Sequence, residues 1–100
     1  VVGTPVKDTI KIVNDGNIER TPSRSTLWSA QTPQTFEYDL IIRAYDEAYK
    51  NNYYGTDDSM LVENIGQKVT MIMGSYDNIK ITSPEDIGIG EQILNSKKNR

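Results

Sequence analysis

The chain has 100 residues, enough for one domain and too few for two separate cores. It contains no Cys and no His, which excludes disulfide scaffolds, Cys-based zinc sites, thiol nucleophiles and the usual general base near pH 7. Eleven basic and fourteen acidic side chains give a net charge of −3, so binding to nucleic acid or to an anionic membrane surface is not expected. Only 36% of the residues are hydrophobic, a small supply for a core.

The first six residues, Val1 to Val6, predict a short buried strand that the sequence enters partway through. They contain no Met, and they lack the basic, apolar and small-residue pattern of a signal peptide. No apolar run in the sequence approaches the roughly 20 residues of a membrane span. Two interpretations of this start stay open: a processed N-terminus, or a chain that lacks upstream sequence.

Residues 8–24 predict a β-hairpin. Polar and apolar side chains alternate over residues 9–14, and Asn-Asp-Gly-Asn at residues 14–17 supplies turn residues that tolerate positive φ. A ribbon with so few large apolar side chains is marginal alone, so we expect it to lie on another surface, either of its own domain or of a second copy. The Pro- and hydroxyl-rich residues 21–26 predict a loop.

Two helices are expected in the middle of the chain. The hydrophobic period changes to 3.6 from Glu37 to about Asn51, with Thr35 as the predicted N-cap. The apolar stripe of this helix is Leu40, Ile41, Ala44, Tyr45 and Ala48, and we interpret its Tyr residues as packing and surface coverage rather than as a stacking platform. Thr56 or Asp57 is expected to cap a short second helix that stops at Gly66.

The last third of the chain predicts two extended segments and a helix. Residues 69–73 suit a buried strand, and residues 79–82 are strand-like. A Ser-Pro-Glu-Asp string at residues 83–86 predicts a helix start, and Gly88 and Gly90 are expected to let this helix approach a sheet closely. This order of elements indicates an α/β layer fold with too few strands for a sheet covered on both faces.

Without His or Cys, the chemistry open to this chain is electrostatic, and phosphoryl or nucleotidyl transfer is the reaction class that depends most on charge and positioning. Lys80 lies between two Ile residues at a predicted strand end, where open α/β sheets bind ligands. Arg24 in its Ser/Thr-rich loop is a second candidate, and for both residues a solvated surface role is the alternative. Asp57 and Asp58 are interpreted as helix-capping residues rather than metal ligands. The residues alone therefore predict an anion-binding α/β domain.

Four strings in order carry a more specific resemblance. They are Asp-Thr-Ile-Lys at 8–11, Leu-Trp-Ser-Ala-Gln-Thr-Pro-Gln-Thr-Phe at 27–36, Thr-Asp-Asp-Ser at 56–59 and Asn-Ile-Lys-Ile-Thr-Ser-Pro-Glu-Asp at 78–86. Together they resemble the C-terminal half of 2-C-methyl-D-erythritol 4-phosphate cytidylyltransferases over essentially the whole chain. The resemblance implies that residues 1–100 are the C-terminal part of a three-layer, Rossmann-like nucleotidyltransferase domain, with residues 8–24 as a protruding β-arm.

The resemblance also implies an activity, a cytidylyl transfer from CTP to 2-C-methyl-D-erythritol 4-phosphate in non-mevalonate isoprenoid biosynthesis. The products are CDP-methylerythritol and pyrophosphate, with Mg²⁺ on the triphosphate, in a cytoplasmic homodimer. By motif, Lys80 would contact phosphate, and Thr32, Thr56 and Asp57 would bind substrate. Thr9 and Arg24 on the β-arm would hold the sugar-alcohol phosphate bound in the other subunit.

One departure from the family pattern is large, since the Gly-rich loop that wraps the CTP triphosphate is missing. The only Gly-x-Gly, at residues 88–90, lies inside a predicted helix. We therefore expect the N-terminal CTP-binding half to be absent and this chain alone to be inactive.

Two alternative functions stay open. Ribitol 5-phosphate cytidylyltransferases share the 31–34 and 78–82 motifs, although residues 27–28 and 55–57 favour the methylerythritol enzyme. The chain could otherwise be a non-catalytic dimerisation module that exchanges its arm.

Overall fold

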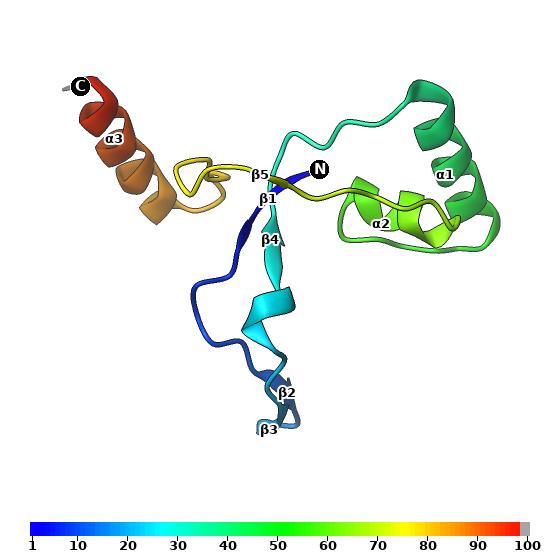
Figure 1. Ribbon diagram of the computed structural model, residues 1–100, viewed down its shortest axis with the longest axis horizontal. Helices are drawn as coiled ribbons and strands as arrows, with labels where there is room; N and C mark the ends of the chain where they lie inside the picture. Colours follow the sequence, from blue (N-terminus) through cyan, green and yellow to red (C-terminus); the bar gives the residue numbers. More distant parts are fainter. Residues whose placement is uncertain (99–100) are drawn as a thin grey trace.

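A small three-stranded sheet holds the N-terminal segment of the chain, as seen in the computed structural model, which describes residues 1–98. Its central strand β1 (Val2–Pro5) pairs antiparallel with β4 (Trp28–Ala30) and parallel with β5 (Ile72–Met73) (Figure 1). A Cβ on Gly3 would lie 2.6 Å from both Met71 Sδ and the Ser29 backbone oxygen, so glycine permits this close approach. The predicted N-terminal strand is confirmed.

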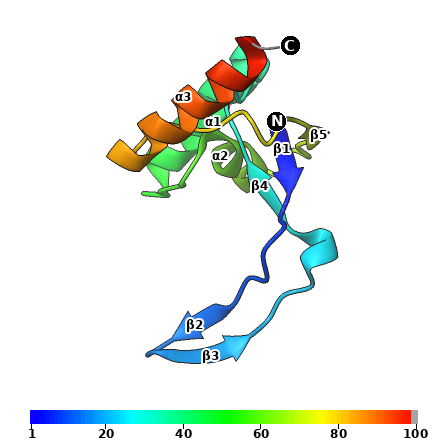
Figure 2. The ribbon, with the colours of Figure 1, turned by 90° about the vertical axis from the view of Figure 1, so that its left-hand side faces the viewer.

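The predicted hairpin is also confirmed. Strand β2 (Ile12–Asn14) pairs antiparallel with β3 (Asn17–Arg20), and the two turn residues Asp15 and Gly16 have φ values of 51° and 78°. These left-handed conformations match the twist of a tight hairpin. Among residues 1–98 the two strands contact each other and no other helix or strand, and Figure 2 shows the hairpin extending away from the sheet.

The hydrophobic core lies between two helices, α1 (Tyr38–Lys50) and α2 (Asp58–Asn64). Four side chains are buried there, and the partly buried side chains around them come from α1 and from the segments beside the two helices. The four are Ala44, Ala48, Leu61 and Val62. The small alanines of α1 let the two helix backbones approach, and the apolar side of the predicted stripe faces α2. The expected stop of α2 is confirmed, since Gly66 follows it with a φ of 83°.

The predicted start of α1 needs a correction. Thr35 was expected as the N-cap, but Glu37 occupies that position and makes no side-chain capping hydrogen bond. An N-cap side chain must reach the amides two or three residues into the helix, and Thr35 lies two residues too early to do so. The first helical turn instead begins with the Ile41 N–H donating to the Glu37 carbonyl at 3.1 Å.

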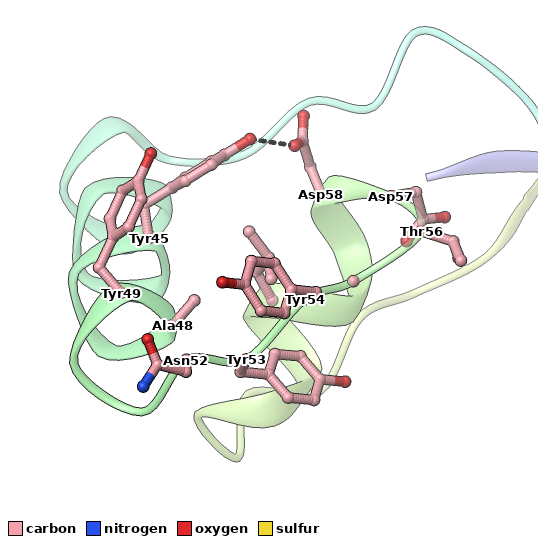
Figure 3. Close-up of a pocket in the computed structure, with 11 residues that line it drawn as sticks. Tyr45, Ala48, Tyr49, Asn52, Tyr53, Tyr54, Thr56, Asp57 and Asp58 are labelled. Carbon is pink, nitrogen blue, oxygen red and sulfur yellow. Dashed lines mark hydrogen bonds between the residues drawn. The ribbon is translucent and has the colours of Figure 1, made fainter.

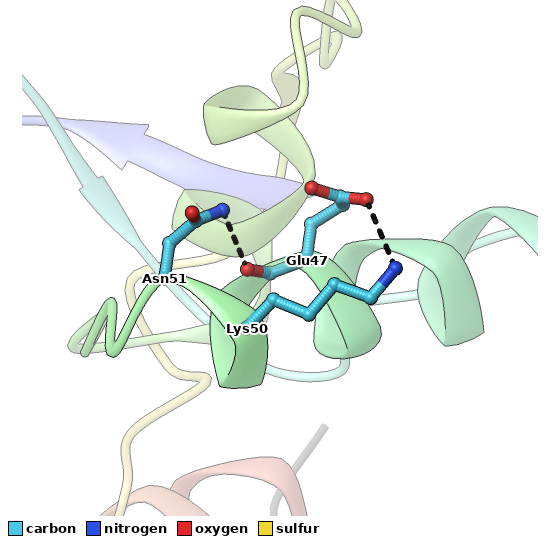
Figure 4. A network of polar contacts seen from close by, with 3 residues as sticks. All are labelled: Glu47, Lys50 and Asn51. Atoms are coloured by element: carbon cyan, nitrogen blue, oxygen red, sulfur yellow. Dashed lines mark hydrogen bonds and ion pairs between the residues drawn. The ribbon is translucent and has the colours of Figure 1, made fainter.

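The end of α1 is confirmed at the predicted Asn pair. The Asn51 side-chain amide donates to the Glu47 carbonyl at 2.9 Å, and the Asn51 backbone N–H donates to the same oxygen at 3.1 Å (Figure 4). The Lys50 ammonium lies 3.9 Å from the Glu47 carboxylate, an exposed ion pair that contributes little stability. Asn52 then turns the chain with a φ of 52°.

Two strand predictions are wrong in part or in full. Within the expected buried strand 69–73, only Ile72 and Met73 form β5, and their side chains are 55% and 63% exposed. The cause is that β5 pairs with β1 alone among the described residues. Residues 79–82 form no strand, because no neighbouring strand of residues 1–98 lies where they could pair, and strand propensity needs such a partner.

The C-terminal helix α3 (Pro84–Lys98) begins where predicted, with Pro84 at its first position. The Asp86 carboxylate accepts hydrogen bonds of 3.1 Å from the Thr82 and Ser83 backbone N–H groups and from the Thr82 hydroxyl. These bonds, the Thr82 amide first, hold the pKa of Asp86 below its usual value. The expected packing of α3 on a sheet is wrong for residues 1–98, where α3 contacts no other helix or strand (Figure 1).

The described residues are spread out for their number. The radius of gyration is 16.9 Å, against about 13 Å for a compact domain of 100 residues. The apolar side chains of α3 contribute to this open arrangement, since none of them is buried. None of the helices within residues 1–98 has the length and apolar character to cross a membrane.

Candidate functional site

Four of the six predicted site residues line one pocket of about 370 Å³: Thr32, Thr56, Asp57 and Lys80. Three separate segments supply them. Thr32 follows β4, Thr56 and Asp57 precede α2, and Lys80 lies in the segment between β5 and α3. The pocket is lined further by Gln31, Gln34 and Asn78. One cation, two hydroxyl groups and several amide groups therefore meet at a single site although they lie up to 49 residues apart in the sequence.

Asp57 is the most constrained side chain of this pocket. Its Oδ1 accepts from the Met60 backbone N–H at 3.0 Å, which is the predicted N-cap of α2, and from the Ser59 hydroxyl at 2.9 Å. Its Oδ2 accepts from the Gln34 side-chain amide at 2.9 Å. Gln34 in turn accepts from the Ser59 N–H at 3.1 Å, so the segment after β4 is joined to the start of α2. The predicted capping role of Asp57 is confirmed.

Burial and hydrogen bonding act in opposite directions on the Asp57 carboxylate. Burial raises its pKa, and the hydrogen bonds from Gln34, Met60 and Ser59 together outweigh burial, so the pKa lies below the ordinary value of 3.8. The folded protein therefore binds a proton at Asp57 less readily than the unfolded chain does. Its contribution to stability is complete above pH 3.8 and is lost as the pH falls through the lowered value.

We expect Asp57→Ala to reduce the free energy of unfolding by about 1 kcal/mol at pH 7, because a helix cap is lost. The difference from wild type should shrink when urea unfolding is repeated at pH 3, which is below the ordinary pKa of 3.8, so that the unfolded chain binds a proton at Asp57 and the folded protein does so less readily. Asp46→Ala is the matched control, since the Asp46 side chain accepts no hydrogen bond from the described residues. A difference for Asp57→Ala that stays constant from pH 7 to pH 3 would contradict the assignment.

Lys80 reaches the pocket from a segment that two amide side chains hold in place. The Gln31 side-chain amide donates to the Ser75 carbonyl at 2.7 Å and to the Asn78 carbonyl at 3.1 Å. The Asn78 side-chain amide donates to the Thr32 carbonyl at 2.8 Å. Sequence reasoning assigned no role to Gln31 or Gln34. The signal in the sequence that could have indicated a role for them was their position on either side of Thr32-Pro33 in the string at residues 31–34.

The other two predicted site residues, Thr9 and Arg24, do not line this pocket. Thr9 is exposed on the segment that leads into the hairpin, and Arg24 begins η1 (Arg24–Thr26) on the way back. The Arg24 guanidinium donates to the Lys7 carbonyl at 2.8 Å, at the base of the hairpin. Both residues therefore lie on the projecting part of the molecule, outside the group formed by Lys80, Thr32 and Thr56.

A second pocket of about 400 Å³ lies behind Thr56 and Asp57, which line both pockets. Figure 3 shows Tyr45 and Tyr49 of α1 on one side and Tyr53 and Tyr54 of the following loop on the other. The Tyr45 hydroxyl donates to the Asp58 carboxylate, and this hydrogen bond is the first cause of a raised Tyr45 pKa. No group of three His, Cys, Asp or Glu side chains that could hold a metal ion occurs among residues 1–98.

The fold is that of a mixed α/β protein. Beyond its strand ends the pocket holds a lysine and hydroxyl groups, and α/β folds bind anionic ligands with such an arrangement. Comparison with known proteins identifies the family within this class. The family model of the 2-C-methyl-D-erythritol 4-phosphate cytidylyltransferases matches residues 1–96, and the chain belongs to this family. The family that the four sequence strings indicate is confirmed, and the part of the family's chain that these residues span stays a prediction.

Individual relatives agree with the family assignment. The chain is 76% identical over 98 residues to a 2-C-methyl-D-erythritol 4-phosphate cytidylyltransferase of Clostridioides difficile (strain 630), covering 98% of this chain and 41% of that protein. Against a Syntrophotalea carbinolica protein of the same name, the identity is 53% over 96 residues, with 96% and 41% covered. The chain thus spans about two-fifths of the length of the curated relatives it matches.

Solved structures show the same fold. A 4-diphosphocytidyl-2C-methyl-D-erythritol synthase of Anaerococcus prevotii matches with a TM-score of 0.85 and 38% identity, covering 95% of this chain and 43% of that one. The 2-C-methyl-D-erythritol 4-phosphate cytidylyltransferase of Francisella tularensis matches with a TM-score of 0.84 and 28% identity, covering 93% and 44%. The expected α/β class is therefore confirmed.

Proposed function

We propose that this chain is the C-terminal part of an enzyme that transfers a cytidylyl group from CTP to 2-C-methyl-D-erythritol 4-phosphate. The observation that carries the proposal is the convergence of Lys80, Thr32 and Thr56 on one pocket, in a chain of this family. The full-length enzyme would consist of this chain and a CTP-binding part that we propose precedes it. That complete protein would have the three-layer, Rossmann-like nucleotidyltransferase fold and act in the cytoplasm, in non-mevalonate isoprenoid biosynthesis.

The reaction is a displacement at phosphorus. A phosphate oxygen of the methylerythritol phosphate attacks the α-phosphorus of CTP and forms a new P–O bond. The bond between the α-phosphorus and its bridging oxygen to the β-phosphorus breaks, and pyrophosphate leaves with the electron pair. Negative charge builds up on the phosphate oxygens during this step, and a fixed cation stabilises it. Among residues 1–98, Lys80 is the only cationic side chain that lines the pocket, and we assign it this role.

The neutral groups of the pocket orient the substrate. The Thr32 and Thr56 side chains are exposed and line the cavity. The Thr32 hydroxyl can donate to phosphate or accept from a sugar hydroxyl, whereas the Thr56 hydroxyl donates to Met60 Sδ at 3.0 Å and can accept from a sugar hydroxyl. The Asp57 carboxylate is held by three side-chain and backbone donors and lines the same cavity. Its negative charge suits a sugar hydroxyl as partner and repels phosphate, so we propose that Asp57 binds at the polyol end.

Magnesium is expected on the CTP triphosphate, where it would neutralise charge and orient the leaving pyrophosphate. Among residues 1–98 no group of three acidic side chains converges that could hold a metal ion. Asp57 is also already committed to Gln34, Ser59 and Met60. We therefore assign no magnesium ligand to this chain.

The hairpin is the part of the chain that suits a second subunit. It carries Val13 and Ile18 more than half exposed, and within residues 1–98 it contacts no other helix or strand. We propose that it is a β-arm of a homodimer, placing Thr9 and Arg24 at the sugar-alcohol phosphate bound by the partner. An arginine on such an arm supplies a second, bidentate contact to phosphate.

The proposal is tested by assaying the full-length enzyme for pyrophosphate release from CTP with each of two acceptors. We expect turnover with 2-C-methyl-D-erythritol 4-phosphate and at least about tenfold lower kcat/KM with D-ribitol 5-phosphate, because an active site that hydrogen-bonds one polyol leaves polar groups unpaired with another. We also expect no turnover from the 100-residue chain alone.

Each other outcome identifies an alternative. A preference for ribitol 5-phosphate would assign the enzyme to the ribitol class. Release of pyrophosphate by the isolated chain would overturn the proposal that the CTP site lies outside it. Absence of turnover with both acceptors in the full-length protein, together with dimer formation through the hairpin, would leave the dimerisation module as the function.

A further inference from the structure

The segment that carries Lys80 has no backbone pairing with the sheet beyond Gly74. The last ladder bond beyond β5 runs from the Gly74 N–H to the Gly3 carbonyl at 2.8 Å, and residues 75–82 belong to no strand. Local turn bonds remain, such as Asn78 N–H to the Ser75 carbonyl at 3.0 Å. Such turn bonds shape the segment but do not fix its distance from the other walls of the pocket.

Side chains connect this segment to the rest of the fold. The Tyr76 hydroxyl donates to the Pro5 carbonyl and the Asn78 amide donates to the Thr32 carbonyl, both at 2.8 Å, and Gln31 adds two further bonds. Its backbone is held by the sheet, because the Gln31 N–H donates to the Val2 carbonyl at 2.9 Å. Both hydrogens of its side-chain amide are donated to the segment that carries Lys80, one to the Ser75 carbonyl at 2.7 Å and one to the Asn78 carbonyl at 3.1 Å. These two bonds span the turn that leads into Lys80, and they start one residue before Thr32. Gln31 and Asn78 therefore both relate the lysine wall of the pocket to the threonine wall.

The backbone of the segment is adapted to this side chain. A Cβ on Gly74 would lie 2.3 Å from the Gln31 Oε1 atom, a distance that real side chains do not adopt. Gly74 has no need of glycine for a left-handed conformation, since its φ is not among the positive ones. A side chain at residue 74 would therefore have to displace the end of the Gln31 side chain.

We propose that Gln31 is a positioning residue, which holds the Ser75–Asn78 turn so that Lys80 lies opposite Thr32 and Thr56. This inference rests on the proposed cytidylyl transfer, because it deepens the role of the same pocket. Gln31 does not act on the reacting atoms in this proposal. Its amide hydrogens are both bound to backbone carbonyls, and its effect on the reaction passes through Lys80.

The experiment compares Gln31→Leu, Gly74→Ala and Lys80→Ala in the full-length enzyme, with Gln67→Leu as the matched control at an exposed glutamine outside this pocket. We expect Gln31→Leu to lower kcat by about tenfold or more while KM for CTP changes little, since displacement of a catalytic group by about 1 Å costs up to about a hundredfold. Gly74→Ala should reproduce the defect by displacing the glutamine. In the Lys80→Ala background, Gln31→Leu should lower kcat by less than about twofold further.

Hydrogen exchange gives a second readout that does not depend on activity. Peptides covering residues 74–80 should exchange faster in Gln31→Leu, whereas peptides from α2 should be unchanged. Unchanged exchange at 74–80 overturns the proposed hydrogen bonding, whether or not the wild-type protein is active. Faster exchange with unchanged kcat overturns the positioning role. The role is also overturned if Gln31→Leu lowers kcat by the same factor in the Lys80→Ala variant as in the wild-type enzyme. If wild type shows no cytidylyl transfer, the proposed function fails and positioning for that reaction fails with it, while the exchange data still decide the contact itself.

Discussion

Lys80→Ala should lower kcat of the full-length enzyme by about a hundredfold to a thousandfold, the usual cost of removing one group that stabilises transition-state charge. Lys80 is the only cation lining the pocket, so the described residues offer no second side chain to take its place. Its side chain is exposed and takes no part in the hydrophobic core, so the folded state should persist.

The measurement is steady-state pyrophosphate release together with thermal unfolding of the same samples. Lys68→Ala is the matched control, since Lys68 is also exposed and lies outside the pocket. We expect that control to retain wild-type kcat, and we expect both variants to unfold near the wild-type temperature. Near-normal turnover by Lys80→Ala in a folded enzyme would remove Lys80 from the reaction.

Subunits that each lack one half of the proposed composite site should complement one another. Arg24→Ala alone should lose about tenfold to a hundredfold in kcat/KM for the sugar-alcohol phosphate, the value of a charge-assisted hydrogen bond. Lys80→Ala alone should be nearly inactive. If the arm of one protomer serves the pocket of the other, the mixed dimer contains one site with both residues intact and one with neither.

Denaturing the two variants together and refolding them at equal amounts should therefore restore about a quarter of wild-type activity, since random pairing makes half of the dimers mixed and each has one intact site. The same mixing of Lys80→Ala with wild type is the control for refolding. Activity that stays at the mean of the two separate variants would show that Arg24 and Lys80 of one protomer serve the same site, and the arm would then have no role in the partner.

The local parts of the fold were readable from the sequence because their causes lie within a few residues. The 15–16 turn depends on two residues that tolerate positive φ, and the cap of α2 depends on Asp57 lying three residues before the amide it accepts from. The start of α3 is likewise indicated by Pro84 and the acidic residues Glu85 and Asp86 that follow it. Where even a local feature was misplaced, as with Thr35, the error was two residues along the chain.

Strand predictions were less successful because a strand depends on its partner. Residues 69–73 and 79–82 have similar β propensity, yet only Ile72 and Met73 lie beside β1, and residues 79–82 pair with no strand of residues 1–98. The apolar face of α3 was expected to meet a sheet, and its sequence contains no sign of where that sheet would lie.

The sequence by itself determined the family, through four strings in order, and the elements whose signals are local. The tertiary structure decided which of the named residues meet, because Thr32, Thr56 and Lys80 come together only when β4, the start of α2 and the segment after β5 are folded against one another. It also brought in Gln31, whose two bonds reach 44 and 47 residues along the chain. Contacts between residues so far apart in the sequence produce no periodic pattern in it. They depend on how separate helices and strands pack, and not on the spacing of residues within a single helix or strand.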